Sequence, residues 1–296
     1  MDISFLIQII LNIAHSSLII ILISYSFQVI YKTTKFFHIS HGITITFGAY
    51  FTYLFSVELG LGLPVSMALA IILSTVQSLI VFSLIYRYLK DLKTSNWLIL
   101  IASLGVYVVL QNLISLLFGD DTKSFRTWKV KEGYEVGGAY VTDVQLISIF
   151  VIVVLLILSH CFIEKTIIGK QIKAVSSNLS LSSLLGISAN NTTKYSFAIG
   201  SALASCAGIL IAAETDMTPT MGFNWLLYAV VAMIIGGMGK MRYLILGALL
   251  LTTAQHLSAY YLDSKWMNAT AYIILCVFLY FKPYGFSGNK LKKAEL

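Results

Sequence analysis

Residues 35–54 read KFFHISHGITITFGAYFTYL, and this stretch decides how the rest of the chain is interpreted. It is long enough to cross a membrane, because a helix of about 20 residues spans the roughly 30 Å hydrocarbon core. Yet two histidines, one serine and three threonines interrupt its apolar residues. Polar side chains at membrane depth are costly and usually face other helices. The stretch therefore predicts an internal helix of a multi-helix membrane protein.

The composition of the whole chain supports this class. Its 296 residues are 58% hydrophobic and 11% charged, whereas soluble domains carry about 25% charged residues. The apolar runs are continuous, unlike the alternating segments of about 10 residues that form membrane β-barrels. We therefore expect an all-α polytopic transmembrane bundle, one domain over 1–296, with about 8–9 membrane segments. The candidate segments are 5–30, 36–57, 63–86, 96–118, 143–163, 195–214, 222–238, 243–262 and 266–282.

Charge distribution predicts the orientation. With the N-terminus outside and every segment crossing, 15 of the 20 Lys and Arg residues lie on the cytoplasmic side, as does the C-terminus. The positive-inside rule favours this arrangement, which also accounts for the net charge of +7 without a nucleic-acid partner. Segment 222–238 is short and ends near Gly236, Gly237 and Gly239, so it either crosses or is re-entrant; the downstream charges favour crossing. The five outer basic residues are Lys123, Arg126, Lys129, Lys131 and Lys265.

Two loops are long enough to carry function. The extracytoplasmic loop 119–142 contains Gly137-Gly138 between short alternating stretches, which is typical of a small hairpin or cap. A solvated connector is the alternative. The cytoplasmic loop 164–194 places Leu181, Leu184 and Leu185 at i, i+3 and i+4, followed by Gly186 as a helix C-cap. A cytoplasmic helix with an exposed leucine stripe either docks a partner or lies on the bilayer, and the serine-rich surroundings favour docking.

Several kinds of chemistry are absent from the sequence. It has no phosphate-binding loop, so we expect no ATP hydrolysis by this chain and no enzymatic activity. His38 and His41 share HxxH spacing, but no carboxylate-rich partners complete a metal site, and no bound cofactor is expected. The predicted membrane segments bury no Asp or Glu, which argues against proton- or sodium-driven transport. Energy for any transport must come from outside the chain.

The segment 36–57 carries small residues at every fourth position, namely Ser40, Thr44 and Gly48. Such a face lets a neighbouring helix backbone approach closely. One interpretation is a tightly packed internal helix. The other is that His38, Ser40, His41 and Thr44 line a polar path for a small hydrophilic solute.

Four motifs in order resemble one known family, the permeases of branched-chain amino acid ABC transporters, on the LivH side of the LivH/LivM pair. Ser40-His41-Gly42 with Gly48-Ala49-Tyr50 matches its first motif. The inner loop resembles its coupling segment through Gly169, Lys173, Ala174, Val175, Asn178, Leu184, Gly186 and Ile187. Residues 219–241, with Pro219 and Gly222, resemble a third motif, and the terminal FKPYGFSG resembles the last.

The resemblance implies a permease subunit of an ABC importer in the bacterial inner membrane. It implies a LivM-like second permease, two ATP-binding cassette subunits that hold ATP-Mg, and an extracytoplasmic solute-binding protein. It places the coupling to the ATPase at Gly169, Lys173, Ala174, Leu181, Leu184, Leu185 and Gly186. It also assigns His38, Ser40, His41, Gly42, Thr44, Gly48, Pro219 and Gly222 to the translocation pathway and its packing.

The sequence departs from the family where His38-Ile39-Ser40 replaces the usual Asn-containing motif and where Lys173 replaces a common Arg. Branched-chain amino acid, urea and short-amide permeases share the scaffold, so the solute stays open between them. Two alternatives lie outside the family. One is an ATP-independent channel or facilitator, and the other is a membrane enzyme that uses His38 and His41.

Overall fold

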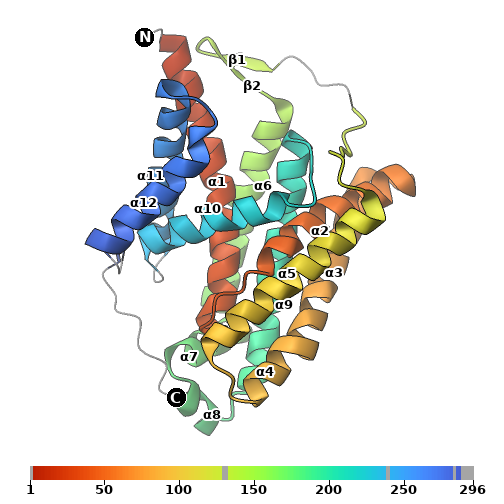
Figure 1. The fold of residues 1–296 in the computed structure, drawn as a ribbon, viewed down its shortest axis with the longest axis vertical. Coiled ribbons are helices and arrows are strands. Elements are labelled where there is room, and N and C mark those ends of the chain that lie inside the picture. The colour runs from red at the N-terminus through yellow and green to blue at the C-terminus, as the bar shows by residue number, and fades with distance from the viewer. Residues whose placement is uncertain (1–2, 129–132, 238–240, 283–284, 288–296) are drawn as a thin grey trace. The chain divides into compact units, whose positions relative to one another are not determined.

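The computed structural model describes residues 3–128, 133–237, 241–282 and 285–287, and Figure 1 shows its helices. Long apolar helices dominate, as the composition predicts. Two π-helical segments extend them: η1 (Leu54–Glu58) follows α2, and η2 (Phe82–Tyr86) links α3 to α4. The α-helices are α1 (Ile3–Thr34), α2 (His41–Tyr53), α3 (Leu63–Val81), α4 (Arg87–Asp91), α5 (Asn96–Phe118), α6 (Asp143–Lys165), α7 (Ile167–Ser177), α8 (Leu179–Leu184), α9 (Ala189–Glu214), α10 (Met221–Gly236), α11 (Met241–Tyr261) and α12 (Trp266–Phe281).

Five described helices are long and apolar enough to cross a membrane. A sixth span results if α10 and α11 are counted together as one broken span, while α12 is a shorter apolar helix. The structure therefore confirms an all-α protein with several membrane-spanning helices. The five are Ser4–Thr34, Leu63–Asp91, Asn96–Phe118, Asp143–Lys165 and Ala189–Glu214.

The start of α2 differs from the prediction. The sequence suggests a helix from residue 36, but α2 begins at His41. Lys35 has a φ of 60°, in the left-handed region, which ends α1. A turn then follows in which the N–H groups of His41 and Gly42 donate to the carbonyls of His38 and Ile39. His38 therefore precedes the helix that carries His41.

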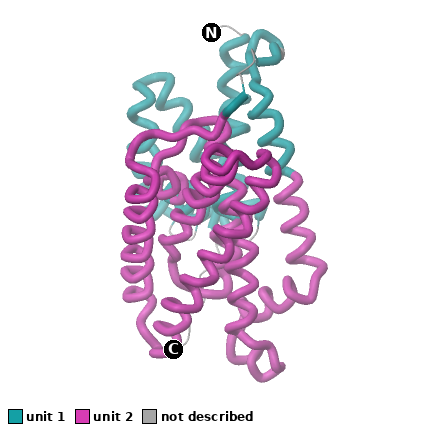
Figure 2. The backbone as a smooth tube through the Cα atoms, turned by 90° about the vertical axis from the view of Figure 1, so that its right-hand side faces the viewer, with its two compact units in different colours: residues 1–25, 127–153, 227–296 teal, residues 26–126, 154–226 magenta. Residues whose placement is uncertain are grey.

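The chain forms two compact units, coloured separately in Figure 2. Unit 1 contains residues 1–25, 127–153 and 227–296, and unit 2 contains residues 26–126 and 154–226. In unit 2, α2 packs mainly against α9 and α3. An apolar cluster joins α3, η2 and α9 to the end of α1 and the start of α5; its buried members are Ile30, Phe36, Val81, Phe82, Tyr86, Ile99 and Phe197.

Small residues explain the close packing of α3 in unit 2. Ser66, Ala70, Ser74 and Ser78 recur every fourth residue, and each is fully or almost fully buried. The hydroxyl of Ser201 on α9 donates to Ser78 Oγ over 2.6 Å. A stripe of this kind allows helices to approach closely and to satisfy their polar groups across the contact.

Unit 1 contains the predicted extracytoplasmic hairpin. Strands β1 (Tyr134–Val136) and β2 (Ala139–Val141) pair antiparallel. Gly137 and Gly138 have φ values of 60° and 83°, which suit the tight two-residue turn. The side chain of Gln8 on α1 bonds both backbone groups of Tyr140, at 2.8 and 3.1 Å. The hairpin is therefore ordered against α1.

Glycines also set the packing of α10 and α11 within unit 1. A Cβ on Gly247 would overlap the carbonyl oxygen of Ala232, and one on Gly236 would overlap that of Tyr243. The two helices therefore contact each other through backbone. Of the three glycines at the end of the predicted segment 222–238, Gly236 and Gly237 are described, whereas Gly239 lies outside the described residues.

Candidate functional site

The predicted pathway residues gather around α2, which is the most buried helix of unit 2. Every residue from His41 to Tyr50 is buried. Thr44, the middle residue of the predicted small-residue face, is 1% exposed. Pro219 is also buried and lies in the connection between α9 and α10. The structure thus brings these positions into one packed region.

Glycines let three helices meet at α2. A Cβ on Gly48 would lie 2.5 Å from the carbonyl oxygen of Ser205 on α9. A Cβ on Gly222, in the first turn of α10, would overlap the carbonyl oxygen of Gly42, and the Gly222 N–H donates to Thr46 Oγ1 over 3.2 Å. Gly42, Gly48 and Gly222 therefore act in close backbone packing.

His38 belongs to a buried polar cluster, although it lies outside the helix. Its Nδ1 is 3.3 Å from Ser40 Oγ, which in turn lies 2.6 Å from the Tyr86 hydroxyl. The rings of Tyr86 and Phe197 pack against the His38 ring, with centroids 5.0 and 4.9 Å away. Ser40 therefore links the entrance of α2 to η2.

His41 makes a separate contact at the first position of α2. Its Nε2 lies 2.9 Å from Ser26 Oγ on α1. The Phe27 ring packs edge-on against it, with centroids 5.9 Å apart. The two histidine rings lie 5.8 Å apart. Among the described residues, no group of three or more His, Cys, Asp or Glu side chains is placed to hold a metal ion.

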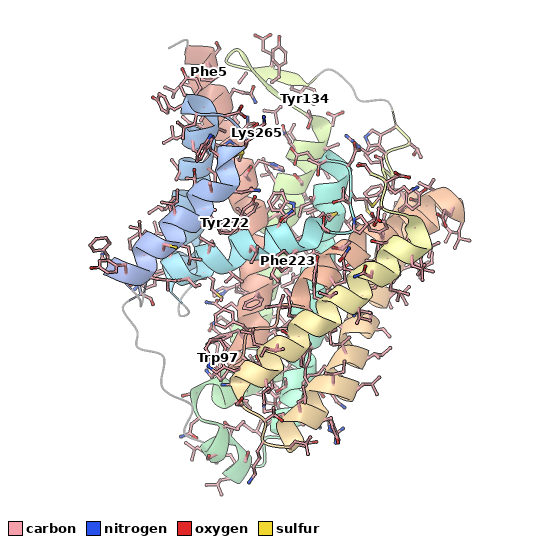
Figure 3. All side chains as sticks on the ribbon, in the orientation of Figure 1. Phe5, Trp97, Tyr134, Phe223, Lys265 and Tyr272 are labelled. Carbon is pink, nitrogen blue, oxygen red and sulfur yellow. The ribbon has the colours of Figure 1, made fainter. Side chains whose placement is uncertain are left out.

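A polar contact joins the 119–142 loop to the connection that contains Pro219. Lys123 and Met217 exchange two backbone hydrogen bonds of 3.0 and 2.9 Å. Arg126 pairs with Asp216 at 2.5 Å and donates to the Glu214 carbonyl over 3.1 Å. Nearby, Phe223 at the start of α10, which is labelled in Figure 3, packs against Tyr107 with ring centroids 5.1 Å apart. The loop after α5 is therefore tied to the connection between α9 and α10.

The predicted coupling segment forms two short helices, α7 and α8, at the end of unit 2 where α4 ends (Figure 1). Their starts are fixed by side-chain caps: Thr166 accepts from the Gly169 N–H, and Asn178 accepts from the Leu181 N–H. A Cβ on Gly169 would overlap the backbone of Ile163, so α7 turns back closely on the end of α6. Ala174 is half-buried.

The leucine stripe is exposed, as predicted. Leu181, Leu184 and Leu185 are 55%, 85% and 72% exposed. Gly186 has a φ of 78°, and the Ile187 N–H donates to the Ser182 carbonyl over 3.0 Å, which is the bond of a Schellman cap. An apolar surface of this kind at a capped helix end is suited to protein contact.

Lys173 reaches back from α7 to α6. Its Nζ lies 2.5 Å from Glu164 Oε2, with both side chains close to half exposed. An exposed pair of this kind contributes little to stability, so its main effect is to orient α7.

Sequence reasoning missed several residues that complete the region. Tyr86, Phe197 and Ser26 contact the two histidines, and Gly208 packs against Ile45 of α2. The small residues of α9 at 200, 201, 204, 205 and 208 recur with helical spacing and could have indicated a close contact. The aromatic pairing across η2 and α9 leaves no comparable periodic pattern.

The family comparison decides the class of the protein. Residues 9–282 match the family model described as branched-chain amino acid transport system / permease component. The chain belongs to this permease family. It is a permease subunit of an ABC importer and not an enzyme.

Named relatives agree with the family. The permease is 26% identical over 282 residues to the high-affinity branched-chain amino acid transport system permease protein LivH of Salmonella typhimurium, covering 90% of this chain and 91% of the relative. It is 27% identical to BraD of Pseudomonas aeruginosa, with the same coverage. It is 25% identical to a probable LivH of Methanocaldococcus jannaschii, covering 94% and 91%.

One solved structure has a similar fold. PsaBC from Streptococcus pneumoniae in complex with Fab aligns with a TM-score of 0.53 at 14% identity, covering 94% of this permease and 93% of that chain. At this identity the likeness shows the fold alone.

Proposed function

We propose that this permease moves a small polar solute, a branched-chain or other amino acid, across the bacterial inner membrane. The names of its relatives support the solute class. The single observation that carries the mechanism is the exposed leucine stripe of α8, which stands on a loop fixed by two side-chain caps and a glycine cap. An exposed apolar surface on a capped helix of this kind suits an ATP-binding cassette subunit as its partner.

The partners follow from the transport class. We infer a LivM-like second permease subunit, two ATP-binding cassette subunits and an extracytoplasmic solute-binding protein. ATP-Mg belongs to the cassette subunits, since this chain has no phosphate-binding loop. Gly169, Lys173, Ala174, Leu181, Leu184, Leu185 and Gly186 form the proposed coupling surface of the permease.

We infer an extracytoplasmic N-terminus, a cytoplasmic C-terminus and about 8–9 membrane segments in a single domain. The distribution of Lys and Arg supports this orientation. Besides the five long helices, α2 with η1, α10, α11 and α12 supply the remaining apolar segments. The hairpin loop 119–142 then faces the binding protein, and the loop 164–194 faces the cassette.

The region around α2 serves the movement of the helices in this proposal. Gly42, Gly48 and Gly222 provide close, largely side-chain-free contacts, and Pro219 is buried in the adjoining connection. His38, Ser40, His41 and Thr44 supply polar groups beside the solute path. Close glycine contacts allow helices to slide with small steric penalties, which suits a permease that alternates between inward and outward access.

Two alternatives differ in measurable ways. A urea or short-amide permease would keep the same partners but transport a different solute. An ATP-independent channel would transport without a cassette subunit, and its flux would be unaffected by changes in α8.

The experiment that tests the proposal is affinity purification of the tagged chain from its native membrane in mild detergent, followed by mass spectrometry. Recovery of an ATPase with a phosphate-binding loop together with a second hydrophobic permease supports it. Reproducible recovery of the well-folded chain alone contradicts it and favours the channel.

A further inference from the structure

A group of charged side chains from three elements converges beside the start of the coupling segment. The ammonium group of Lys32, in the last turn of α1, lies within electrostatic range of Lys35, Lys173 and Glu164. The carboxylate of Glu164 also interacts electrostatically with His160, one turn earlier on α6. We call Lys32, Lys35, Lys173, His160 and Glu164 the cationic cluster. Lys32 and Lys173 interact with the single carboxylate of Glu164, and Lys35 lies near Lys32, so the cluster holds excess positive charge.

The position of the cluster distinguishes it from a solvated surface patch. It lies where two spanning helices end, since α1 ends at Thr34 and α6 at Lys165. Exposed apolar residues flank it: Ile157 on the same face of α6 as His160 and Glu164, and Ile167 at the start of α7. These two are 57% and 75% exposed. Apolar surface next to excess positive charge matches the boundary between acyl chains and headgroups.

We propose that the cationic cluster binds the phosphate group of an anionic phospholipid in the cytoplasmic leaflet, with the acyl chain along the exposed apolar face that ends at Ile157. The proposal rests on the orientation proposed above. Lys173 connects the site to the coupling segment, because its ammonium group on α7 already pairs with Glu164 on α6. A bound phosphate competes with Glu164 for Lys173 and so changes how firmly α7 is held to α6.

A carboxylate of the cassette subunit is the competing occupant. The geometry favours the lipid because the leucine stripe of α8 lies beyond α7, farther from the end of α1 (Figure 1). The cluster is built from the membrane-proximal ends of α1 and α6 instead. Positive charge at the cytoplasmic ends of helices is general, but here lysines from the end of α1 and from α7 converge on one acid of α6.

The test is native mass spectrometry of the purified, delipidated full chain titrated with phosphatidylglycerol. Lys32→Gln/Lys35→Gln should weaken binding about tenfold or more, because each lysine near a membrane surface contributes about 1 kcal/mol to lipid attraction. Lys90→Gln/Lys93→Gln removes the same charge from another inner loop and should leave binding nearly unchanged. Equal loss in both variants, or no loss in the first, overturns the site.

A second pair of variants tests the competition with the carboxylate. Glu164→Gln should tighten phosphatidylglycerol binding several-fold, whereas Asp91→Asn, which removes the acid paired with Arg87, should not. Equal tightening in both contradicts the proposed competition. Thermal unfolding of each variant, measured in the same detergent, shows whether it is folded.

Two further measurements distinguish a lipid phosphate from free phosphate, and a lipid from a carboxylate of the cassette subunit. Millimolar inorganic phosphate should not displace the lipid; complete displacement assigns the cluster to soluble anions and overturns the lipid site. Loss of lipid binding in the complex with cassette subunits assigns the cluster to protein contact. These experiments measure lipid binding to the permease and not transport. A negative result therefore does not contradict the importer function, and lipid binding can still be measured if the importer function proves wrong.

Discussion

Gly208 of α9 packs so closely on α2 that a Cβ at this position would overlap the carbonyl oxygen of Ile45. Backbone rather than side chain therefore separates the two helices. Because α2 makes its largest contact with α9, this glycine sets the spacing of the centre of unit 2.

Gly208→Ala should lower the stability of the permease by about 3 kcal/mol, since an added methyl group forces a backbone shift in a filled interior. The thermal unfolding midpoint in detergent checks this. Gly105→Ala is the matched control, because a Cβ there meets no atom within 4 Å. It should be neutral or slightly stabilising. An unchanged midpoint for Gly208→Ala would show that the helices separate easily.

Leu184→Asp/Leu185→Asp should abolish ATP-driven uptake while the chain still inserts and folds. Both side chains are largely exposed, so charge there costs the folded permease little but disrupts an apolar contact with a partner. Uptake by reconstituted vesicles and recovery of the cassette subunit give the measurement. Leu92→Asp, at an exposed leucine after α4, should retain both. Normal uptake by the double variant would rule out docking at α8.

Tyr86→Phe should destabilise the permease by about 1–2 kcal/mol, because it removes the 2.6 Å hydrogen bond to Ser40 inside a buried cluster. Thermal unfolding again provides the readout. Tyr88→Phe removes a hydroxyl from a neighbouring position that is 61% exposed and should have little effect. Equal shifts in the two variants would mean that the Ser40 contact adds nothing to stability.

His41→Ala tests whether the polar residues of α2 affect solute movement. If they lie beside the path, the uptake KM or kcat should change, and Ser26→Ala, which removes the 2.9 Å partner of His41, should change it in the same direction. Uptake is compared at equal amounts of folded protein. Wild-type kinetics in both variants would limit His41 to packing.

Arg126→Gln should loosen the contact between the 119–142 loop and the connection from α9 to α10. Arg126 is joined to Asp216 at 2.5 Å, and the adjacent Lys123 and Met217 exchange two backbone bonds. Amide hydrogen exchange at 123 and 217 should become several-fold faster, because both bonds open more often. Arg87→Gln removes a different surface pair and should leave these amides unchanged. Unaltered exchange in Arg126→Gln would assign the contact to the backbone alone.

Local rules predict the helices and their caps well. α5 spans 96–118, as the apolar run indicates, and Gly186 has the left-handed conformation expected of a C-cap. The exposed leucines of α8 and the Gly137-Gly138 hairpin are confirmed for the same reason, since each depends on residues close in sequence.

Contacts between distant segments are what the sequence does not predict. The first turn of α2 starts later than the apolar pattern suggests because Lys35 has a left-handed backbone, which composition does not encode. Tyr86 and Phe197 lie beside His38 only because η2 and α9 pack there. Glu164 meets Lys173 because α7 turns back at Gly169. The functional roles of all these residues remain predictions.

The capped helices α7 and α8 also have a mechanical consequence. Three side-chain caps, at Thr166, Asn178 and Ser188, fix where α7, α8 and α9 begin. The segment from 166 to 188 is therefore held at the start of each of its helices. Both small helices pack on α9, and α9 packs on α2. A displacement of α8 at Leu184 would therefore be passed to α2 through two helix contacts, first with α9 and then with α2.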